Sequence, residues 1–229
     1  MQLKDRVLAL RDRVQAAAER SGRSPDVIDV VAVTKTVPVE GIREAYECGL
    51  RVFGESRVQE AVEKIPQLPD DIEWHLIGHV QSNKVKHLPG LVSWVQSVDR
   101  PDIIDKLARR FGDQGQTVQV LLELNTSGES SKHGFSSLAE AHRAAGRIVE
   151  LQALELRGAM TIGPLTENES EIRTAFATLR RFFEELQSAY SELRIDTLSM
   201  GMSGDFEIAI EEGATMIRPG SVLFGPREM

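Results

Sequence analysis

The sequence predicts a single (β/α)8 TIM barrel with an extra amino-terminal helix, and two observations lead to this fold class. Eight short runs of apolar and β-branched residues, each typical of a buried parallel strand, alternate with amphipathic segments that can carry helices. An eightfold parallel barrel usually takes about 250 residues. The 229 residues of this chain therefore accommodate a compact version with little left for an appended domain. A doubly wound open sheet is the alternative fold.

The elements follow in order from the amino terminus. Between Gln2 and Arg20 the apolar residues recur every three or four positions, which predicts a helix before the first strand. The first predicted strand, Val27–Thr34, is too rich in β-branched residues for a good helix and too short to span a membrane. A short helix is predicted over Asp205–Glu212. The remaining predicted strands are Leu50–Gly54, Glu73–Gly78, Trp94–Val98, Thr117–Leu124, Leu156–Ile162, Thr197–Met200 and Met216–Arg218.

Composition limits the classes of function. With 41% hydrophobic and 27% charged residues, the chain resembles an ordinary soluble globular protein. Its net charge of −8, its scattered lysines and arginines and its 5% aromatic content argue against nucleic acid as a partner. The sequence contains no linker, low-complexity stretch or repeat, which indicates one domain over residues 1–229.

The amino terminus and the single cysteine indicate a cytoplasmic protein. The segment Met1–Arg6 is charged within a few residues and lacks the apolar core of a signal peptide. No apolar run approaches the length of a membrane helix. Cys48 can form no disulfide within the chain, which fits a reducing compartment. We therefore expect a cytoplasmic location without membrane contact.

Lys35 is the first candidate for chemistry, because it directly follows the first predicted strand. In parallel α/β folds, ligands bind at the carboxyl ends of the strands. A partly desolvated lysine there can lose its proton and attack a carbonyl to form a Schiff base. Most lysines that follow a strand are solvated loop residues, so this position alone does not assign a role.

Two segments near the carboxyl end predict a phosphate site. Leu198–Asp205 follows a predicted strand and leads into a helix, and Ile217–Ser221 ends the next strand. Their glycines and hydroxyl residues leave backbone N–H groups accessible to a phosphate. Barrels commonly build such a site from the loops after strands seven and eight. A helix cap explains Ser203 and Gly204 equally well, and Asp205 would repel a phosphate unless it points away.

An amine that traps an aldehyde and a phosphate site on the same rim are the two features needed to hold pyridoxal 5′-phosphate. We therefore expect this cofactor, with Lys35 as its anchor. A phosphorylated metabolite in its place is an alternative. We expect no metal, because His75 and His79 lie in a strand-like segment without a recurring ligand spacing. The sequence contains no GxSxG motif and therefore gives no support for a hydrolase triad.

Several longer segments resemble the pyridoxal phosphate homeostasis proteins, also called the YggS/PROSC family, and the match is collinear over essentially the whole chain. The matching segments are Val31–Thr36, Phe53–Glu60, Trp74–Lys84, Asn125–Gly134, Leu198–Ser203 and Ile217–Arg227. The resemblance implies a barrel related to the amino-terminal domain of alanine racemase. It also implies that Lys35 holds the cofactor as an internal aldimine.

By the same resemblance, Ser203, Gly220 and Ser221 contact the phosphate and Arg218 faces the pyridine nitrogen. The family commonly has asparagine where this chain has Ser56, so a hydrogen bond from that amide would need a shorter group or a water. The full set of cofactor-binding residues implied is Lys35, Ser56, His79, Asn83, Met200, Ser203, Gly204, Arg218, Gly220 and Ser221.

The resemblance implies a carrier of the cofactor rather than an enzyme, with a role in intracellular vitamin B6 homeostasis. Alanine racemase uses a tyrosine of a second domain, whereas this sequence ends at Met229 and has only Tyr46 and Tyr190, both on predicted outer helices. We therefore expect no significant turnover of amino acids. A low-activity amino-acid racemase or related enzyme, with Lys35 as anchor and base, is the alternative. Apo-enzymes that need the cofactor are the expected recipients, and a monomer is the expected state.

Overall fold

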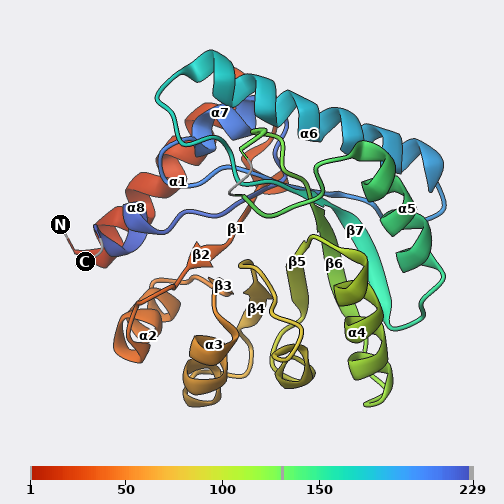
Figure 1. Ribbon diagram of the computed structural model, residues 1–229. Coiled ribbons are helices and arrows are strands. Elements are labelled where there is room, and N and C mark those ends of the chain that lie inside the picture. Colours follow the sequence, from red (N-terminus) through yellow and green to blue (C-terminus); the bar gives the residue numbers. More distant parts are fainter. Residues whose placement is uncertain (1, 130–131, 227–229) are drawn as a thin grey trace.

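The computed structural model describes residues 2–129 and 132–226, and its strands form one closed parallel ring (Figure 1). Every neighbouring pair of strands is parallel, in the order β1-β9-β8-β7-β6-β5-β4-β3-β2. The strands are β1 (Asp29–Val30), β2 (Ala32–Val33), β3 (Val52–Glu55), β4 (Glu73–Leu76), β5 (Trp94–Val98), β6 (Val118–Glu123), β7 (Leu154–Met160), β8 (Thr197–Ser199) and β9 (Met216–Ile217).

The ring closes because β1 and β2 are two halves of one strand. Strand β1 pairs with β9, whereas β2 pairs with β3, and only Val31 separates the two halves. The N–H of Val31 donates to the carbonyl of Ile217 at 2.9 Å, and the N–H of Val33 donates to that of Pro219 at 2.9 Å. Residues 29–33 therefore act as the first strand of an eight-stranded barrel, which confirms the predicted fold class.

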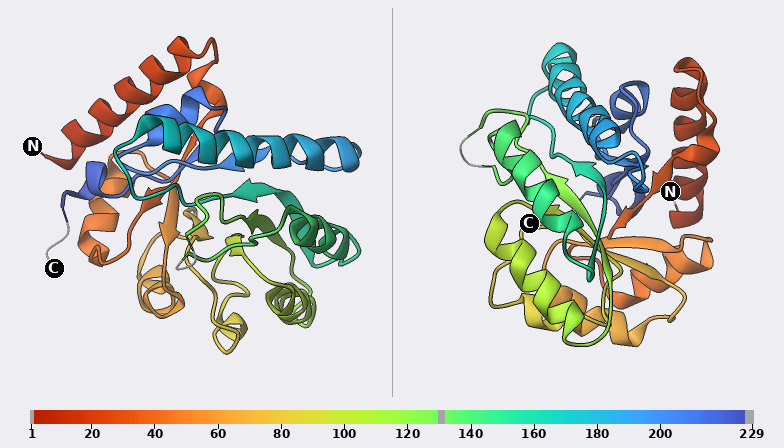
Figure 2. Two further views of the ribbon diagram at one scale, coloured as in Figure 1. Left: turned by 45° about the horizontal axis from the view of Figure 1, so that its top comes forward. Right: turned by 90° about the vertical axis from the view of Figure 1, so that its right-hand side faces the viewer.

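The helices surround this ring, and α1 is the extra amino-terminal helix that the sequence predicts. The α-helices are α1 (Leu3–Arg20), α2 (Val39–Glu47), α3 (Val58–Lys64), α4 (Pro101–Gly112), α5 (Leu138–Val149), α6 (Glu169–Ala189), α7 (Phe206–Glu211) and α8 (Ser221–Phe224). Figure 2 shows α1, in red, along the outside of the barrel beside α7 and α8. Ion pairs join α1 to α7, with Arg13 and Glu207 at 3.1 Å and Arg20 and Glu211 at 2.8 Å.

One connection differs from the pattern of alternating strands and helices. Between β4 and β5 the chain forms only a 3-10 turn, Val85–His87. Pro89 and Gly90 follow at once, and Gly90 adopts a φ of 74°. A proline and a glycine with positive φ prevent a longer helix. Two other 3-10 turns are present, Pro25–Val27 before β1 and Ile65–Gln67 directly after α3.

Apolar side chains fill the space between strands and helices, whereas a chain of polar side chains crosses the inside of the barrel. Ser199 on β8 donates to Gln96 on β5 at 2.7 Å, and these strands are not neighbours in the sheet, so the contact spans the interior. The amide of Gln96 lies 2.6 Å from His75, and Arg218 donates to Ser199 at 2.5 Å. This chain of hydrogen bonds runs from β4 to the residue after β9 and holds Arg218 in place.

In the part of the chain that the structure describes, no helix combines the length and the apolar character that crossing a membrane requires.

Candidate functional site

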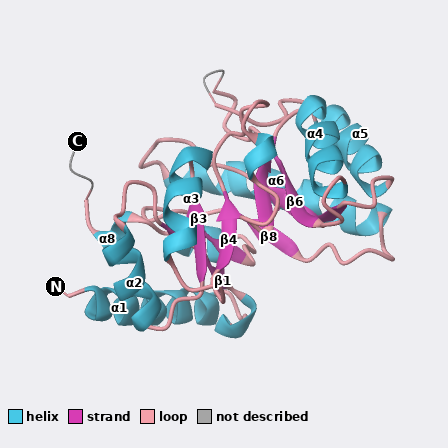
Figure 3. Ribbon diagram, turned by 90° about the horizontal axis from the view of Figure 1, so that it is seen from below, coloured by secondary structure: helices cyan, strands magenta, loops and turns pink. Residues whose placement is uncertain are grey.

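Lys35 lies at the carboxyl end of the split first strand and lines a cavity of about 360 Å³. Its side chain is half-buried, and Gly220 and Ser221 from the loop after β9 line the same cavity. Helices α1, α2 and α8 border this cavity, and Figure 3 shows them grouped on one side of the barrel. The structure therefore brings the candidate amine to one of the two predicted phosphate loops.

The two predicted phosphate loops are joined through Ser203. The hydroxyl oxygen of Ser203 accepts the backbone N–H of Gly220 at 3.0 Å and that of Val222 at 3.2 Å. Gly201 starts this loop with a φ of 93°, and a Cβ there would lie 2.6 Å from the Cβ of Ala209, so the turn requires glycine. The N–H of Gly220 and that of Val222 in the first turn of α8 thus converge on the Ser203 hydroxyl, which joins the two predicted phosphate loops.

Asp205, which could have opposed a phosphate, is engaged by its own loop. Its carboxylate accepts the N–H of Met202 at 2.5 Å, and the residue is buried. Burial raises the pKa of Asp205, while the Met202 N–H and the nearby Arg218 act in the opposite direction. The carboxylate therefore closes the turn Met202–Asp205 that leads into α7, and it makes no capping hydrogen bond to the helix itself.

Arg218 is a buried cation held by uncharged partners. Besides Ser199, its guanidinium donates to the carbonyl of Thr161 at 2.7 Å, and only 3% of the residue is exposed. Burial lowers its pKa to about 10, against the opposing charges of Asp205 and Glu123. The side chain therefore stays protonated at neutral pH and remains a hydrogen-bond donor.

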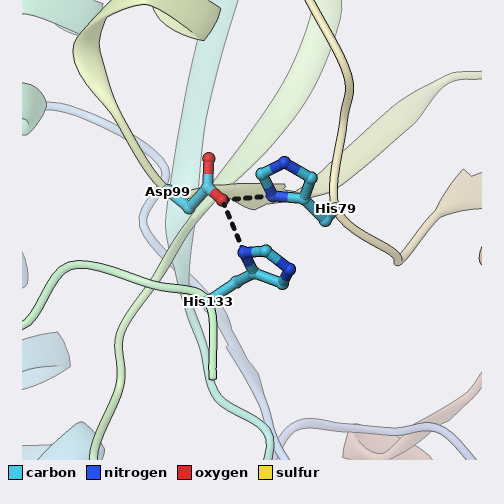
Figure 4. A group of neighbouring side chains, drawn as sticks. All are labelled: His79, Asp99 and His133. Atoms are coloured by element: carbon cyan, nitrogen blue, oxygen red, sulfur yellow. Dashed lines mark hydrogen bonds and ion pairs between the residues drawn. The ribbon is translucent and has the colours of Figure 1, made fainter. Parts of the chain in front are cut away.

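His79, Asp99 and His133 come from the segments that follow β4, β5 and β6, and their side chains lie together (Figure 4). Nδ1 of His79 lies 2.6 Å and Nδ1 of His133 lies 3.8 Å from the same oxygen of Asp99. The two rings stack with centroids 3.8 Å apart. The sequence analysis missed this group because its members are far apart along the chain. The one local signal was Asp99-Arg100 directly after a strand.

These are residue types that bind zinc, but the carboxylate is already paired with a cation. Arg100 donates to the other oxygen of Asp99 at 2.6 Å and lies 3.4 Å from both ring nitrogens of His79. A metal ion here would have to lie next to this guanidinium, which disfavours it. We interpret the group as a hydrogen-bonded part of the site, and the expected absence of a metal stays a prediction.

The other residues predicted from the resemblance lie in different surroundings. Ser56 follows β3, and its carbonyl is so close to Gly78 that a Cβ on Gly78 would overlap it. Met200 is fully buried in the main core, and Gly204 is exposed with open space around it. Asn83 is exposed and lines a separate hollow against α4, so the structure does not bring it to the Lys35 cavity. Arg227 and residues 130–131 of the matching segments lie outside the described residues.

Glu123 is a buried carboxyl group that the sequence analysis also missed. It ends β6, only 3% of it is exposed, and its Oε2 has no hydrogen-bond partner among the described residues. Burial, and after it the charge of Asp99, raise the pKa of Glu123 to about 7 against the opposing charge of Arg218. The group is therefore largely protonated in mildly acidic solution and half-ionised near neutrality.

This raised pKa predicts that Glu123 makes the fold less stable as the pH rises. Between about pH 4.5 and 7 the unfolded chain has released this proton while the folded chain retains it. Over that interval the free energy of unfolding should fall by up to about 3 kcal/mol from this group alone. Denaturant unfolding of the protein and of Glu123→Gln, at pH 5 and pH 8, measures this. The variant should gain stability relative to the parent at pH 8, and a difference independent of pH would contradict the assignment.

Comparison with known proteins places this chain in a family. The model of the alanine racemase N-terminal domain matches residues 7–228. The "Pyridoxal phosphate homeostasis protein" of Aquifex aeolicus is 43% identical over 227 residues, which cover 98% of each chain. The structure of PipY from Synechococcus elongatus PCC7942, "with PLP bound", is 36% identical, with a TM-score of 0.85 over 98% of this chain and 100% of that one.

Alanine racemase from E. faecalis shares the fold at 18% identity, with a TM-score of 0.73. The match covers 96% of this chain but only 58% of the racemase. The family model over residues 7–228, together with this barrel, assigns the chain to the class of alanine racemase N-terminal domains. Within that class, the chain belongs to the family of pyridoxal phosphate homeostasis proteins.

Proposed function

We propose that this protein binds pyridoxal 5′-phosphate as a Schiff base with Lys35 and serves in the intracellular homeostasis of this cofactor. The observation that carries the proposal is the cavity that Lys35 shares with Gly220 and Ser221. It places an amine beside the loop best suited to a phosphate. The name of the Aquifex aeolicus relative and the cofactor bound to PipY support the same conclusion.

The residues present fit each part of the cofactor. Gly220 and Ser221 line the cavity, and the Ser203 hydroxyl joins their loop to the other predicted phosphate loop, so these small and hydroxyl residues suit a phosphate. The amine of Lys35 suits the aldehyde. Arg218 does not line the Lys35 cavity, but it follows β9 two residues before Gly220 and is a buried donor of the kind that a ring nitrogen accepts. When bound, this cofactor supplies an aldehyde that captures amines and a ring that withdraws electrons.

The same residues favour a carrier over an enzyme. Arg218, with a pKa of about 10, donates at neutral pH and would keep the ring nitrogen unprotonated, which weakens the ring as an electron sink. Neither of the two tyrosines of the chain lines the Lys35 cavity. Tyr46 lies on α2 with its hydroxyl donating to Asp71 at 2.8 Å, and Tyr190 ends α6. We therefore propose that amino acids are not turned over at a significant rate.

The alternative is a low-activity amino-acid racemase or related enzyme, and the barrel shared with alanine racemase favours it as second candidate. Purified protein loaded with the cofactor should racemise, transaminate or decarboxylate amino acids no faster than the Lys35→Ala variant. Robust turnover above that control would replace the carrier with the enzyme. Transfer to an apo-enzyme, a cytoplasmic location, a monomeric state and a single domain remain predictions of the proposal.

The first test of the proposal is spectroscopic. Addition of pyridoxal 5′-phosphate to the purified protein should give the visible absorption band of a Schiff base. Reduction with borohydride followed by peptide mapping should place the label on Lys35. If no band forms, or if the label spreads over surface lysines, the cofactor assignment is wrong and a phosphate-binding barrel remains.

A further inference from the structure

The two peptide groups that flank Lys35 are both held by one ion pair. On one side, Nζ of Lys64 donates to the carbonyl of Thr34 at 3.0 Å. On the other side, the N–H of Thr36 donates to Oε2 of Glu60 at 2.9 Å. Lys64 and Glu60, both on α3, are themselves paired at 2.7 Å. The ion pair therefore bridges the backbone immediately before Lys35 and the backbone immediately after it.

The ion pair is shielded from water and anchored in the barrel. The side chains of Lys64 and Glu60 are only 13% and 18% exposed. Lys64 also pairs with Glu55 at 2.9 Å, and the side chain of Glu55 is fully buried at the end of β3. The hydroxyl of Thr34 donates to the same carboxylate at 2.7 Å. Because the charges are enclosed, the geometry of the pair is better defined than that of an exposed ion pair.

The backbone after Lys35 needs such a restraint. Thr36 has a φ of 65°, and among the described residues it is the one non-glycine residue with positive φ. This conformation is unfavourable for a β-branched residue, so it persists only where the surroundings impose it. The bond from the Thr36 N–H to Glu60 supplies that restraint, and the Thr36 hydroxyl donates to the carbonyl of Lys35 at 2.6 Å.

We propose that Glu60 and Lys64 are positioning residues for Lys35: by fixing its two flanking peptide groups, they set the direction in which its amine leaves the strand. The inference rests on the proposed function. In the step concerned, the Lys35 amine adds to the aldehyde carbon, two protons move from nitrogen to the carbonyl oxygen, and water leaves as the C=N bond forms. The rate of this addition depends on how the amine is held.

The test compares two ligands that differ only at the reacting group. The comparison distinguishes a positioning role of Glu60 from general support of the structure. Pyridoxal 5′-phosphate has an aldehyde, whereas pyridoxamine 5′-phosphate has an amine there and cannot bond to Lys35. In Glu60→Ala the Schiff base should form about tenfold more slowly. The affinity for pyridoxamine 5′-phosphate should change less than about twofold, because the phosphate loops are untouched.

Two further variants complete the design. Glu60→Gln keeps an oxygen that accepts the Thr36 N–H and should restore the rate to within about threefold of the parent. Glu63→Ala is the matched control on the same helix, because the Glu63 carboxylate contacts only the exposed Gln59 among the described residues, and its rate should equal that of the parent. If Glu60→Ala does not fold, Glu60→Ser replaces it, since serine is too short to reach Thr36.

The possible results are distinguishable. An unchanged rate in Glu60→Ala, with Lys35 labelled in the parent protein, overturns the positioning role and leaves the proposed function intact. Equal losses for both ligands also overturn it, because they indicate a general structural effect. Failure of borohydride to label Lys35 in the parent overturns the proposed function itself, before any variant is made.

Discussion

Replacement of Lys35 by alanine should abolish covalent capture of pyridoxal 5′-phosphate. The variant removes the amine at the carboxyl end of the split strand and leaves Gly220, Ser221 and the Ser203 bridge unchanged. We expect no Schiff base band, no borohydride label at this site and an affinity for the cofactor lower by about a hundredfold or more. Absorption spectroscopy, peptide mapping and equilibrium dialysis measure these three quantities.

Two controls show whether that loss is specific to the amine. Pyridoxamine 5′-phosphate should still bind to Lys35→Ala, because its phosphate is expected at Gly220 and Ser221, which the variant leaves unchanged. Lys86→Ala, which removes an exposed lysine of the 3-10 turn before β5, should leave the band unchanged. A visible band that persists in Lys35→Ala would show that another lysine holds the cofactor.

Gly158→Ala should cause the largest loss of stability that we predict. Gly158 lies within β7 with a φ of 148°, and a Cβ there would overlap the carbonyl oxygen of Thr197 on β8 and lie 3.1 Å from the ring of Phe183. Strands β7 and β8 cannot move apart to make room for this Cβ without breaking their parallel hydrogen bonds. The variant is therefore destabilised both by backbone strain and by overpacking. We expect the free energy of unfolding to fall by about 3–5 kcal/mol, measured by denaturant titration.

The matched control is Gly112→Ala at the end of α4, where a Cβ would lie 3.7 Å from the Cβ of Ala153, an ordinary contact. Because alanine has the higher helix propensity, this variant should be as stable as the parent within about 1 kcal/mol. Equal unfolding midpoints for Gly158→Ala and the parent would mean that β7 and β8 separate more easily than their packing indicates.

The strands were the most predictable part of the fold, because a buried parallel strand is a local pattern of apolar and β-branched residues. Each of the eight predicted runs overlaps a strand or, for the first run, contains both halves of one, although β3 ends one residue later and β7 begins two residues earlier than predicted. The split at Val31 was not predictable, since it depends on β9 and β3 taking different halves of that strand. Between β4 and β5 the chain forms a 3-10 turn in place of an α-helix, and Pro89 and Gly90 were the only weak indication of this in the sequence.

The site was predictable where it follows strand ends and unpredictable where it depends on contacts between distant segments. Lys35 and the two predicted phosphate loops come after strand ends, and parallel strands place such residues on one rim. The group around Asp99, the buried Glu123 and the support of Lys35 by α3 had no local signature. Such contacts between segments far apart in sequence form only once the ring has closed.

The local pattern of residues was therefore enough to predict the barrel and its amino-terminal helix and to single out Lys35. The spacing of residues along the chain indicates strands, helices and strand ends. Only the tertiary structure shows which side chains meet inside the barrel and how their protonation is altered there. Closure brings β5 opposite β8 and removes Glu123 and Arg218 from water. Burial and proximity then set their pKa values, and neither property can be assigned before the chain is folded.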